Sequence, residues 1–522
     1  MQENESMSEI GKKVCKFFRK DFLFFIIFMI FFISIYIVRP VDNLDELWNY
    51  NFAKQISEGL IPYKDISMII TPLSSFLASI FLNISNELLT MRILGIILST
   101  AIFYMIYRIL KQLTGKEEYS LICTLIMMFL ISGILSYDYN NLLVLFILIA
   151  LAVELFMIKK QESQKLRKLQ NLLIGLISGL VILTKQSIGV IFTFAMIIYP
   201  LININETYKF KNYLKEIIYR IIGLIIPCLL FIIYLIFTDS YSEFISYTIL
   251  GIGTFNNKIP FSHLFKIDFI TKIMAILVLF TIVALVCFII IRLVKRTKEK
   301  ELIAIFLYGM SLMMMIIPIC DKNHFYLASL IIFIGLAYLF LKFYRYMSNK
   351  KVLKNESLKI FIKNFIKCLT YGVLIILFFG TIICNLYNYA IDSSKNNQIK
   401  HYENIVISDN LKHRIEEVDY FIVNQEQDGY RTYILDSEAV VYMIPLDKYS
   451  KNYDMFLNGN FGKDGTKGIL KDILELRENS KAKFLVRNPK YSYNWQLPVD
   501  IINYVRENFE KVDSISIFDV YE

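Results

Sequence analysis

The sequence contains little of what a water-soluble enzyme is built from. Only 20% of its 522 residues are charged, there are 10 prolines and 4 histidines, and the mean hydropathy is +0.50. These values exclude a disordered chain and a soluble globular protein, and they indicate an integral membrane protein. The 7 cysteines show no spacing typical of a metal site or a disulfide framework.

Long apolar runs occupy most of the chain but not its end. Runs near the ~20 residues needed to span a bilayer recur from residue 22 to about residue 388. Residues 392–522 instead contain 17 Lys and Arg and 22 Asp and Glu. We therefore predict a transmembrane domain over residues 1–391 and a separate domain over residues 392–522. The first run follows several basic residues and lacks a cleavage site, which predicts an uncleaved signal anchor.

The formal net charge of +10 comes from short basic clusters between apolar runs. This is the positive-inside pattern and not a nucleic-acid-binding surface. If every cluster is cytoplasmic, neighbouring clusters must be separated by an even number of crossings. About eleven crossings satisfy this condition when residues 66–82, which contain Pro72 and several Ser and Thr, lie at the interface. The amino terminus is then cytoplasmic, and residues 39–90 and 392–522 are extracytoplasmic in a plasma membrane.

Residues 392–522 alternate strand-like and helix-like segments, which predicts an α/β domain. The expected strands are 431–436, 482–487 and 514–521, and the expected helices are 468–479 and 498–509. This alternation favours a mostly parallel, Rossmann-like layer. The glycines of GNFGKDG (459–465) lack dinucleotide-binding spacing, so we interpret this stretch as a turn-rich surface loop.

Residues 42–50, DNLDELWNY, place three carboxylates directly after the first predicted crossing. A helix-like stretch follows, then the turn G-x-x-P-Y-x-D (59–65), then Thr71-Pro72-Leu73 in the interfacial stretch. This arrangement resembles the first outer loop of the GT-C superfamily of polyprenyl-phosphate-sugar-dependent membrane glycosyltransferases. That superfamily includes protein O-mannosyltransferases and bacterial lipid A aminoarabinose transferases.

The resemblance implies inverting transfer of a sugar from a polyprenyl-phosphate donor to a glycan, lipid or protein acceptor of the cell envelope. Such a donor already has a good leaving group, so the enzyme needs a base for the acceptor proton and cations for the departing phosphate. The resemblance assigns Asp45 as the base, with Glu46 as the second candidate. A retaining route would need a second carboxylate about 5–5.5 Å from the first.

Other predicted site residues lie in the later outer loops. Asp138 in SYDYNN (136–141) either acts with Asp45 on a metal or the acceptor, or caps the following helix. Lys185 in LTKQSIG (183–189) is predicted to bind the donor phosphate, as in several relatives. In CDKNHFY (320–326), His324 either contacts the phosphate or is structural, and Lys322 lies on the same face.

One position departs from the family pattern. The aminoarabinose transferases have a lysine before the paired prolines of the interfacial segment, where this chain has Thr71. Lys64 or Lys185 would then supply the missing cation, with Tyr63 of the same turn as a further predicted substrate contact. The chain is therefore not expected to be the lipid A enzyme. No His/Cys cluster occurs, so a divalent metal ion is left open.

Two other classes of function fit a polytopic chain. A secondary transporter or flippase usually has two related halves and charges within its helices. We find no repeat between the halves, the charges gather on the loops, and an outer α/β domain is unusual for a transporter. A non-catalytic membrane scaffold is the second alternative, and in a scaffold Asp45 would be replaceable.

Overall fold

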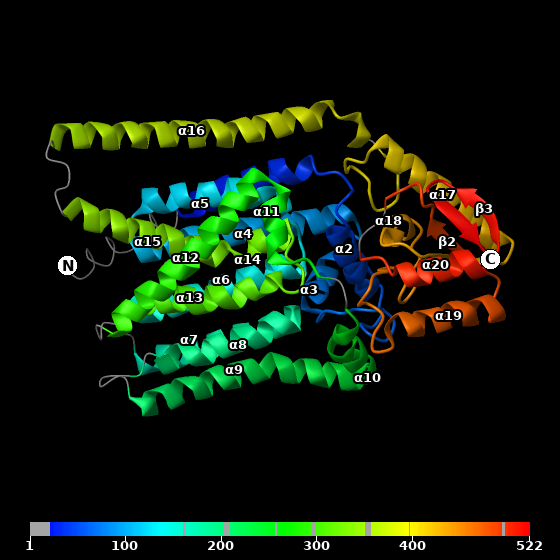
Figure 1. The fold of residues 1–522 in the computed structure, drawn as a ribbon, viewed down its shortest axis with the longest axis horizontal. Helices are drawn as coiled ribbons and strands as arrows, with labels where there is room; N and C mark the ends of the chain where they lie inside the picture. The colour runs from blue at the N-terminus through cyan, green and yellow to red at the C-terminus, as the bar shows by residue number, and fades with distance from the viewer. Residues whose placement is uncertain are drawn as a thin grey trace, which may run out of the picture.

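The computed structural model describes residues 21–159, 163–202, 204, 209–255, 258–294, 299–349, 356–395, 397–492 and 496–522. A bundle of long helices fills one end of the molecule, and helices with a small sheet fill the other end (Figure 1). Helices α2 and α3 lie between these two parts. The predicted class, a polytopic helical membrane protein with a carboxy-terminal α/β part, is confirmed.

The membrane part begins, within the described residues, with the helix Asp21–Ile37. The helices that follow it are α2 Leu44–Ser57, α3 Leu73–Leu82, α4 Leu88–Thr114, α5 Glu117–Ile131, α6 Tyr139–Lys159, α7 Gln164–Thr184, α8 Gln186–Ile202 and α9 Phe210–Phe237. Then come α10 Tyr241–Phe244, α11 Leu264–Ile267, α12 Phe269–Val294, α13 Lys300–Met313, α14 Lys322–Ala328, α15 Leu330–Asn349 and α16 Glu356–Ile391.

The apolar runs form helices because a helix satisfies its own backbone polar groups inside a bilayer. In the described part of the chain, 8 helices are long and apolar enough to cross a membrane. Three of the apolar runs, at 22–38, 188–203 and 301–319, form shorter helices there, namely Asp21–Ile37, α8 and α13. The chain is a multi-pass membrane protein.

The stretch 66–82, which was expected not to cross, is helical only over the 10 residues of α3. Ten residues are too few for a hydrocarbon core that needs about 20. Pro72 directly precedes α3, where its missing N–H costs no helical hydrogen bond. Helix α3 lies at the end of the bundle that faces the carboxy-terminal part (Figure 1).

Helices α7 and α9 touch through their glycines. A Cβ atom added to Gly175 would lie 1.9 Å from the Arg220 carbonyl oxygen, and one added to Gly223 would lie 2.1 Å from the Leu172 carbonyl oxygen. Small residues of this kind let membrane helices approach closely. The turn after α7 carries Lys185, so this packing fixes where that lysine emerges.

A buried ion pair crosses the same region of the bundle. Arg220, which is 0% exposed, lies 2.9 Å from Glu154 and donates to the Asn171 side chain at 2.7 Å. The Tyr308 hydroxyl donates to Glu154 at 2.8 Å. Some charges therefore lie within helices as well as on the loops. Because these groups satisfy one another, the cluster ties α6, α7, α9 and α13 together.

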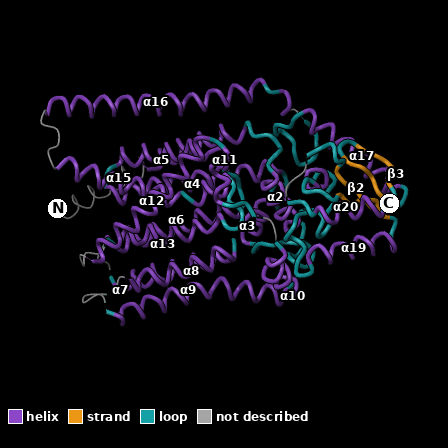
Figure 2. Tube along the Cα trace, viewed as in Figure 1, coloured by secondary structure: helices purple, strands orange, loops and turns teal. Residues whose placement is uncertain are grey.

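The carboxy-terminal part contains a mixed sheet at the far end of the molecule (Figure 2). Its elements are α17 Asp409–Gln427, β1 Arg431–Ile434, α18 Ala439–Met443, α19 Gly465–Asn479, β2 Ala482–Arg487, α20 Val499–Asn508, β3 Lys511–Ile515 and β4 Phe518–Tyr521. The strand order is β1-β2-β4-β3. Only β1 and β2 are parallel, and the other two pairs are antiparallel.

The expectation of a mostly parallel, Rossmann-like layer is therefore wrong. The segment 514–521, expected to be one strand, contributes to both β3 and β4, which pair as a hairpin with Ile515 opposite Phe518. Ser516 between them has φ 53°, and a positive φ is what a two-residue hairpin turn requires. A serine in the sequence predicts such a hairpin turn less strongly than a glycine or an asparagine does.

The glycine-rich stretch 459–465 is a loop, as expected, but only Lys463 and Asp464 of it are exposed. Gly459 has φ 90° and lies against the Phe255 ring, 2.3 Å from an added Cβ. Gly462 has φ 69° and lies against the Ser246 hydroxyl. Residues 459–462 are buried because the connection after α10 covers them. The long 238–270 connection therefore packs on the carboxy-terminal part.

Candidate active site

Helix α2 carries the two acidic residues that the sequence singled out. The Asn43 side chain caps the helix by accepting from the Glu46 backbone N–H at 3.3 Å. This cap places Asp45 and Glu46 in the first turn, where carboxylates also interact favourably with the helix dipole. Successive helix residues point about 100° apart, so the two carboxylates face different surroundings.

Glu46 is a buried anchor. Its side chain is 2% exposed, and its Oε2 lies 3.1 Å from the Arg92 guanidinium on α4. Arg92 also donates to the carbonyl oxygens of Arg39 and Pro40. The pair therefore fixes α2 and the chain that enters it against α4. An acceptor cannot reach a carboxylate held in this way.

Asp45 is the opposite case. Its side chain is exposed to solvent, and among the described residues its carboxylate makes no hydrogen bond or ion pair. Surrounding protein nevertheless raises the pKa of Asp45 to about 6, with Asp138 adding to the shift and His324 and Lys185 opposing it. The structure thus brings Asp45 within electrostatic reach of three other predicted residues.

Asp138 lies directly before α6 and caps it. It is buried, and it accepts from the Ser136 hydroxyl at 2.6 Å and from the Asn141 backbone N–H at 2.8 Å. Burial raises the pKa of Asp138, and these hydrogen bonds oppose the shift. The cap that the sequence left open is therefore present. It is compatible with a second role, because Asp138 also acts on the pKa of Asp45.

Lys185 follows α7 at the same end of the bundle. Its Nζ donates to the Asn140 side chain at 3.0 Å and lies 5.2 Å from the centre of the Tyr139 ring. Burial lowers the pKa of Lys185 to about 8, and the nearby Asp138 and Asp45 charges oppose that change. A half-buried ammonium whose hydrogen-bonded partner is a neutral amide is suited to bind an anion.

His324 lies in the first turn of α14, which Asp321 caps. Asp321 accepts from the His324 backbone N–H at 2.8 Å, and its other oxygen lies 2.9 Å from His324 Nδ1. Burial acts to raise the pKa of Asp321, but the hydrogen bonds and charge of His324 outweigh burial and lower it. Asp321 therefore holds the ring by one nitrogen and leaves Nε2 as the atom that can meet a substrate.

Three further predicted residues have other surroundings. Lys322 is exposed and pairs with Asp268 at 3.0 Å. Lys64 is also exposed, and its carbonyl oxygen accepts from Lys451 at 2.7 Å. Tyr63 is buried with φ 71°, and its hydroxyl donates to the Ile70 carbonyl oxygen at 2.9 Å. Within the described chain, none of the three forms a hydrogen bond or ion pair with the Asp45 group.

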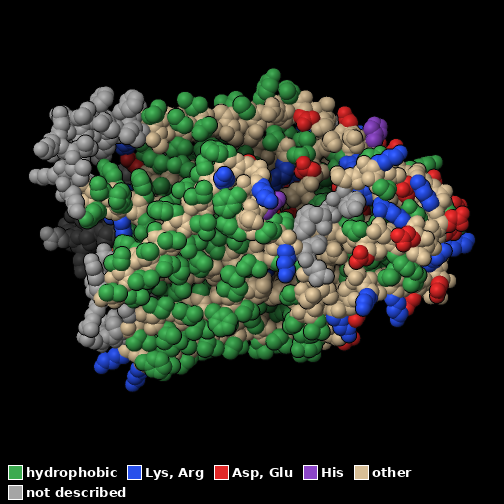
Figure 3. Space-filling view, viewed as in Figure 1, with side chains coloured by type: hydrophobic (Ala, Val, Ile, Leu, Met, Phe, Trp, Pro, Cys, Tyr) green, Lys and Arg blue, Asp and Glu red, His purple; other side chains and the backbone are tan. Residues whose placement is uncertain are grey.

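The surroundings of these residues are polar and open. Hydrophobic side chains cover the helix bundle, charged side chains cover the opposite end, and the surface is hollowed where the two parts meet (Figure 3). Basic side chains and a histidine gather at that hollow. Among the described residues, no group of three or more His, Cys, Asp or Glu side chains is placed to hold a metal ion. We therefore assign no chemical step to a metal.

Three residues around the site lay outside the sequence prediction. Asn140 and Tyr139, which hold Lys185, follow Asp138 directly and belong to the stretch SYDYNN. Their polar and aromatic character next to a predicted acid was an available signal. Arg92 had none, because it lies in the apolar run of α4, 46 residues from its partner Glu46.

Part of the chain matches a known family. Residues 70–237 match the family model described as dolichyl-phosphate-mannose-protein mannosyltransferase. This range begins just before α3 and ends with α9, so it contains Asp138 and Lys185 but not Asp45. No curated protein matches the chain as a whole.

The fold is similar to solved structures over nearly the whole length. ArnT from Cupriavidus metallidurans in the apo state is 10% identical, with 94% of this chain and 95% of that chain covered and a TM-score of 0.56. The same protein bound to undecaprenyl phosphate is 8% identical, with 97% and 98% covered and a TM-score of 0.55.

A more distant likeness extends to an archaeal enzyme. The oligosaccharyltransferase AglB from Archaeoglobus fulgidus, in complex with an inhibitory peptide and a dolichol-phosphate, is 12% identical, with 90% of this chain and 70% of that chain covered and a TM-score of 0.50. At these identities the likeness is one of fold.

Proposed function

We propose that this chain is a GT-C membrane glycosyltransferase, as its sequence predicted, and that it uses a polyprenyl-phosphate-linked sugar as its donor. The sugar passes to an acceptor of the cell envelope with inversion at the anomeric carbon. Support for a lipid-phosphate donor comes from ArnT and AglB, whose structures contain undecaprenyl phosphate and dolichol-phosphate.

The observation that carries the proposal is the environment of Asp45. It is a carboxylate without a fixed partner, it is open to water, and two cationic side chains act on it electrostatically. Its pKa of about 6 leaves it ionised at neutral pH yet more basic than an ordinary aspartate. A general base works best when its pKa lies near the working pH.

In the proposed reaction, Asp45 takes the proton of the acceptor hydroxyl as that oxygen attacks the anomeric carbon. A new carbon–oxygen bond forms on one face of the sugar, and the bond to the phosphate oxygen breaks on the other. Lys185 and His324 stabilise the departing phosphate, since a fixed cation lowers the energy of developing negative charge. Asp138 and Asp321 have supporting roles, because they cap the helices next to these residues.

We also propose that the Asp45 end of the bundle is extracytoplasmic. Helix α4 starts beside α2 and runs for 27 residues, about 40 Å, to the basic cluster Arg108–Lys116 at the other end. Placing that cluster in the cytoplasm obeys the positive-inside rule. Residues 39–90 and the part 392–522 then face the cell envelope, and residues 1–391 form the transferase domain.

The decisive experiment compares two neighbouring aspartates. The full chain, in lipid nanodiscs, is supplied with a radiolabelled undecaprenyl-phosphate-linked hexose and an envelope extract as acceptor. The Asp45→Asn change is expected to reduce transfer at least about 100-fold, the usual contribution of a general base. Asp42→Asn, an exposed residue of the same loop, is the matched control and is expected to keep full activity.

Undiminished transfer by Asp45→Asn would overturn the assignment of the base. In a different outcome, the donor moves across the bilayer and no label reaches an acceptor, in wild type and variant alike. That result would support the transporter alternative.

A further inference from the structure

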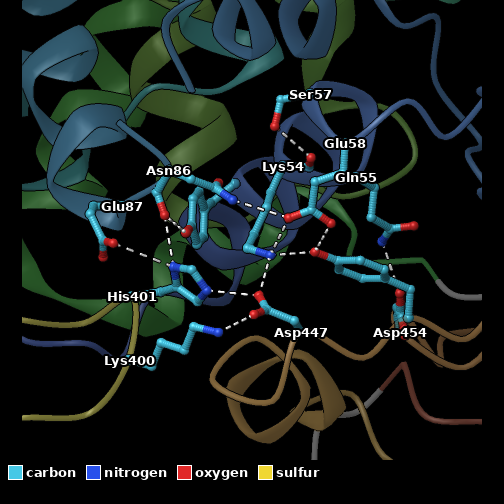
Figure 4. A network of polar contacts seen from close by, with 12 residues as sticks. Lys54, Gln55, Ser57, Glu58, Asn86, Glu87, Lys400, His401, Asp447 and Asp454 are labelled. Carbon is cyan, nitrogen blue, oxygen red and sulfur yellow. Dashed lines mark hydrogen bonds and ion pairs between the residues drawn. The ribbon is translucent and has the colours of Figure 1, made fainter. Parts of the chain in front are cut away.

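The face of α2 opposite Asp45 is held by the carboxy-terminal part. Lys54 follows Asp45 by nine residues, about two and a half helical turns, so the two side chains leave α2 in opposite directions. Lys54 is 0% exposed, and its Nζ lies 2.7 Å from Glu58 and 2.5 Å from Asp447 (Figure 4). It also donates to the Tyr449 hydroxyl. These contacts, which we call the clamp, hold helix α2 on the face opposite the proposed base.

His401 completes this clamp with both of its ring nitrogens. Nδ1 lies 2.7 Å from the Asn86 carbonyl oxygen, and Nε2 lies 2.7 Å from Asp447 Oδ1 (Figure 4). A carbonyl oxygen and a carboxylate can only accept hydrogen bonds, so both ring nitrogens must donate. Only the doubly protonated imidazolium has two N–H groups, whereas a neutral ring would turn a lone pair toward one of these oxygens.

The acceptor of the Nε2 hydrogen bond is ionised. Burial acts to raise the pKa of Asp447, but the hydrogen bonds of Lys400, Lys54 and His401 hold it well below its usual range, so Asp447 is a carboxylate. Glu87 lies 3.6 Å from His401 Nδ1, and Glu403 acts on Glu87.

The charges of the clamp balance only with the imidazolium. Its carboxylates are Asp447, Glu58 and Glu87, and its cations are Lys54, Lys400 and His401. Without the ring proton, one negative charge in this partly buried cluster is left uncompensated.

We propose that His401, as an imidazolium, and Asp447 are positioning residues that lock the carboxy-terminal part onto α2 and so hold Asp45 in its working position. The inference rests on the proposed function, because positioning matters only if Asp45 is the base. The lock is present at low pH. It is lost as the pH rises and the ring gives up a proton, because one of its two hydrogen bonds then disappears.

A second titratable group at this junction, Asp454, is also expected to weaken docking as the pH rises. Its effect must be separated from that of His401. Asp454 accepts from the side chains of Asn51 and Gln55 on α2, at 3.2 and 2.9 Å, and burial raises its pKa to about 7. Its ionisation at higher pH also disfavours the docked state. The Asp454→Asn change removes this contribution and leaves that of His401.

The first test measures docking without activity. Hydrogen–deuterium exchange of residues 44–58 is followed in the full chain in nanodiscs from about pH 6 to pH 9, with correction for intrinsic exchange. Protection is expected to fall at least tenfold across this range in wild type and in Asp454→Asn. In His401→Gln it is expected to be low throughout, and His413→Gln, an exposed histidine on α17, is the matched control that retains wild-type behaviour.

The second test measures transfer. His401→Gln and Asp447→Asn are each expected to lower kcat about tenfold with the donor KM unchanged, since they displace the base and not the phosphate site. Asp45→Asn is expected to be inactive yet to keep the pH-dependent protection, so failure of the proposed function and failure of the lock are distinguishable.

The lock is overturned if protection of residues 44–58 does not depend on pH, or if Asp454→Asn alone abolishes the dependence. It is also overturned if His401→Gln keeps wild-type protection and kcat. Should His401→Gln not fold, wild type and Asp454→Asn decide the matter.

Discussion

Two carboxylates on opposite sides of α2 have opposite surroundings. Asp45 is open to solvent and has no fixed partner among the described residues, and the surrounding protein raises its pKa to about 6. Asp447 faces the rear of the helix, where Lys54, Lys400 and His401 hold its pKa far below the usual range. The first carboxylate is available for chemistry because no described side chain is hydrogen-bonded to it, and the second is fixed in place because its partners saturate it.

The comparison gives a rule for reading the acids of this chain. A carboxylate held by several donors stabilises structure, whereas one that is surrounded but unpartnered is a candidate for catalysis. Glu46 belongs with Asp447 under this rule, although it is adjacent to Asp45 in the sequence. The following experiments test whether the difference holds in solution.

The largest expected effect separates Asp45 from Glu46. Glu46→Gln leaves Arg92 buried without its charge partner, which typically costs about 3–5 kcal/mol, so the unfolding temperature in detergent is expected to fall clearly. Transfer per folded molecule is expected to stay within a few fold of wild type. Asp45→Asn is expected to show the reverse, with normal melting and lost transfer. Equal melting temperatures for wild type and Glu46→Gln would contradict the anchor role.

Lys185 is expected to have the next largest effect, on donor binding. Lys185→Gln is expected to raise the donor KM about tenfold, because a charge-assisted contact to phosphate contributes roughly 1.5–3 kcal/mol. Since its pKa is about 8, the wild-type KM is expected to rise above that pH as the ammonium is lost, and in the variant it is expected to be flat. Lys266→Gln, an exposed lysine on α11, is the control. A wild-type KM that does not change up to pH 9 would argue against Lys185.

The acid limb of the pH–rate profile tests the surroundings of Asp45 more finely. A base must be ionised, so kcat is expected to rise with pH through about 6. The Asp138 charge raises the pKa of Asp45, and Asp138→Asn is therefore expected to move the limb to lower pH. Asp513→Asn, an exposed residue of β3, is expected to leave it in place. A limb that moves to higher pH in Asp138→Asn would refute this electrostatic account.

The smallest expected effect concerns stability at the rear of α2. Asp454 has a folded-state pKa of about 7 against an ordinary value of 3.8, so between these values the folded chain binds a proton that the unfolded chain has lost. Stability therefore falls as the pH rises from about 4 to 7, and the loss persists above pH 7. Asp454→Asn removes this loss, so it is expected to melt higher than wild type at pH 8 and about equally at pH 4. Thermal unfolding followed at both pH values checks the sign.

Local patterns predicted the elements of the fold well. The apolar runs became helices because a bilayer leaves the backbone no other partner, and α3 stopped at ten residues after Pro72. Strand 482–487 was predicted at its observed bounds. The pairing of the last two strands was missed because it depends on one serine with positive φ, and the sequence gives no clear sign of that conformation.

The candidate site was also predictable only in part. Asp45, Asp138, Lys185 and His324 could be picked out because charges at the ends of apolar runs are rare and must gather at one membrane surface. The distinction between Asp45 and Glu46 could not be predicted, because it depends on Arg92 of another helix. Neither could the clamp of His401 and Asp447, whose partners lie hundreds of residues away on α2 and beside α4.

By itself, the sequence determined that this is a multi-pass membrane protein with a carboxy-terminal part of helices and strands and with an acidic stretch after its first apolar run. These properties follow from composition and from contacts between residues close in the chain. Only the tertiary structure decided which acid is free and which is held. The ionisation of a carboxylate depends on burial and on charges a few ångströms away, and those charges come from distant parts of the chain.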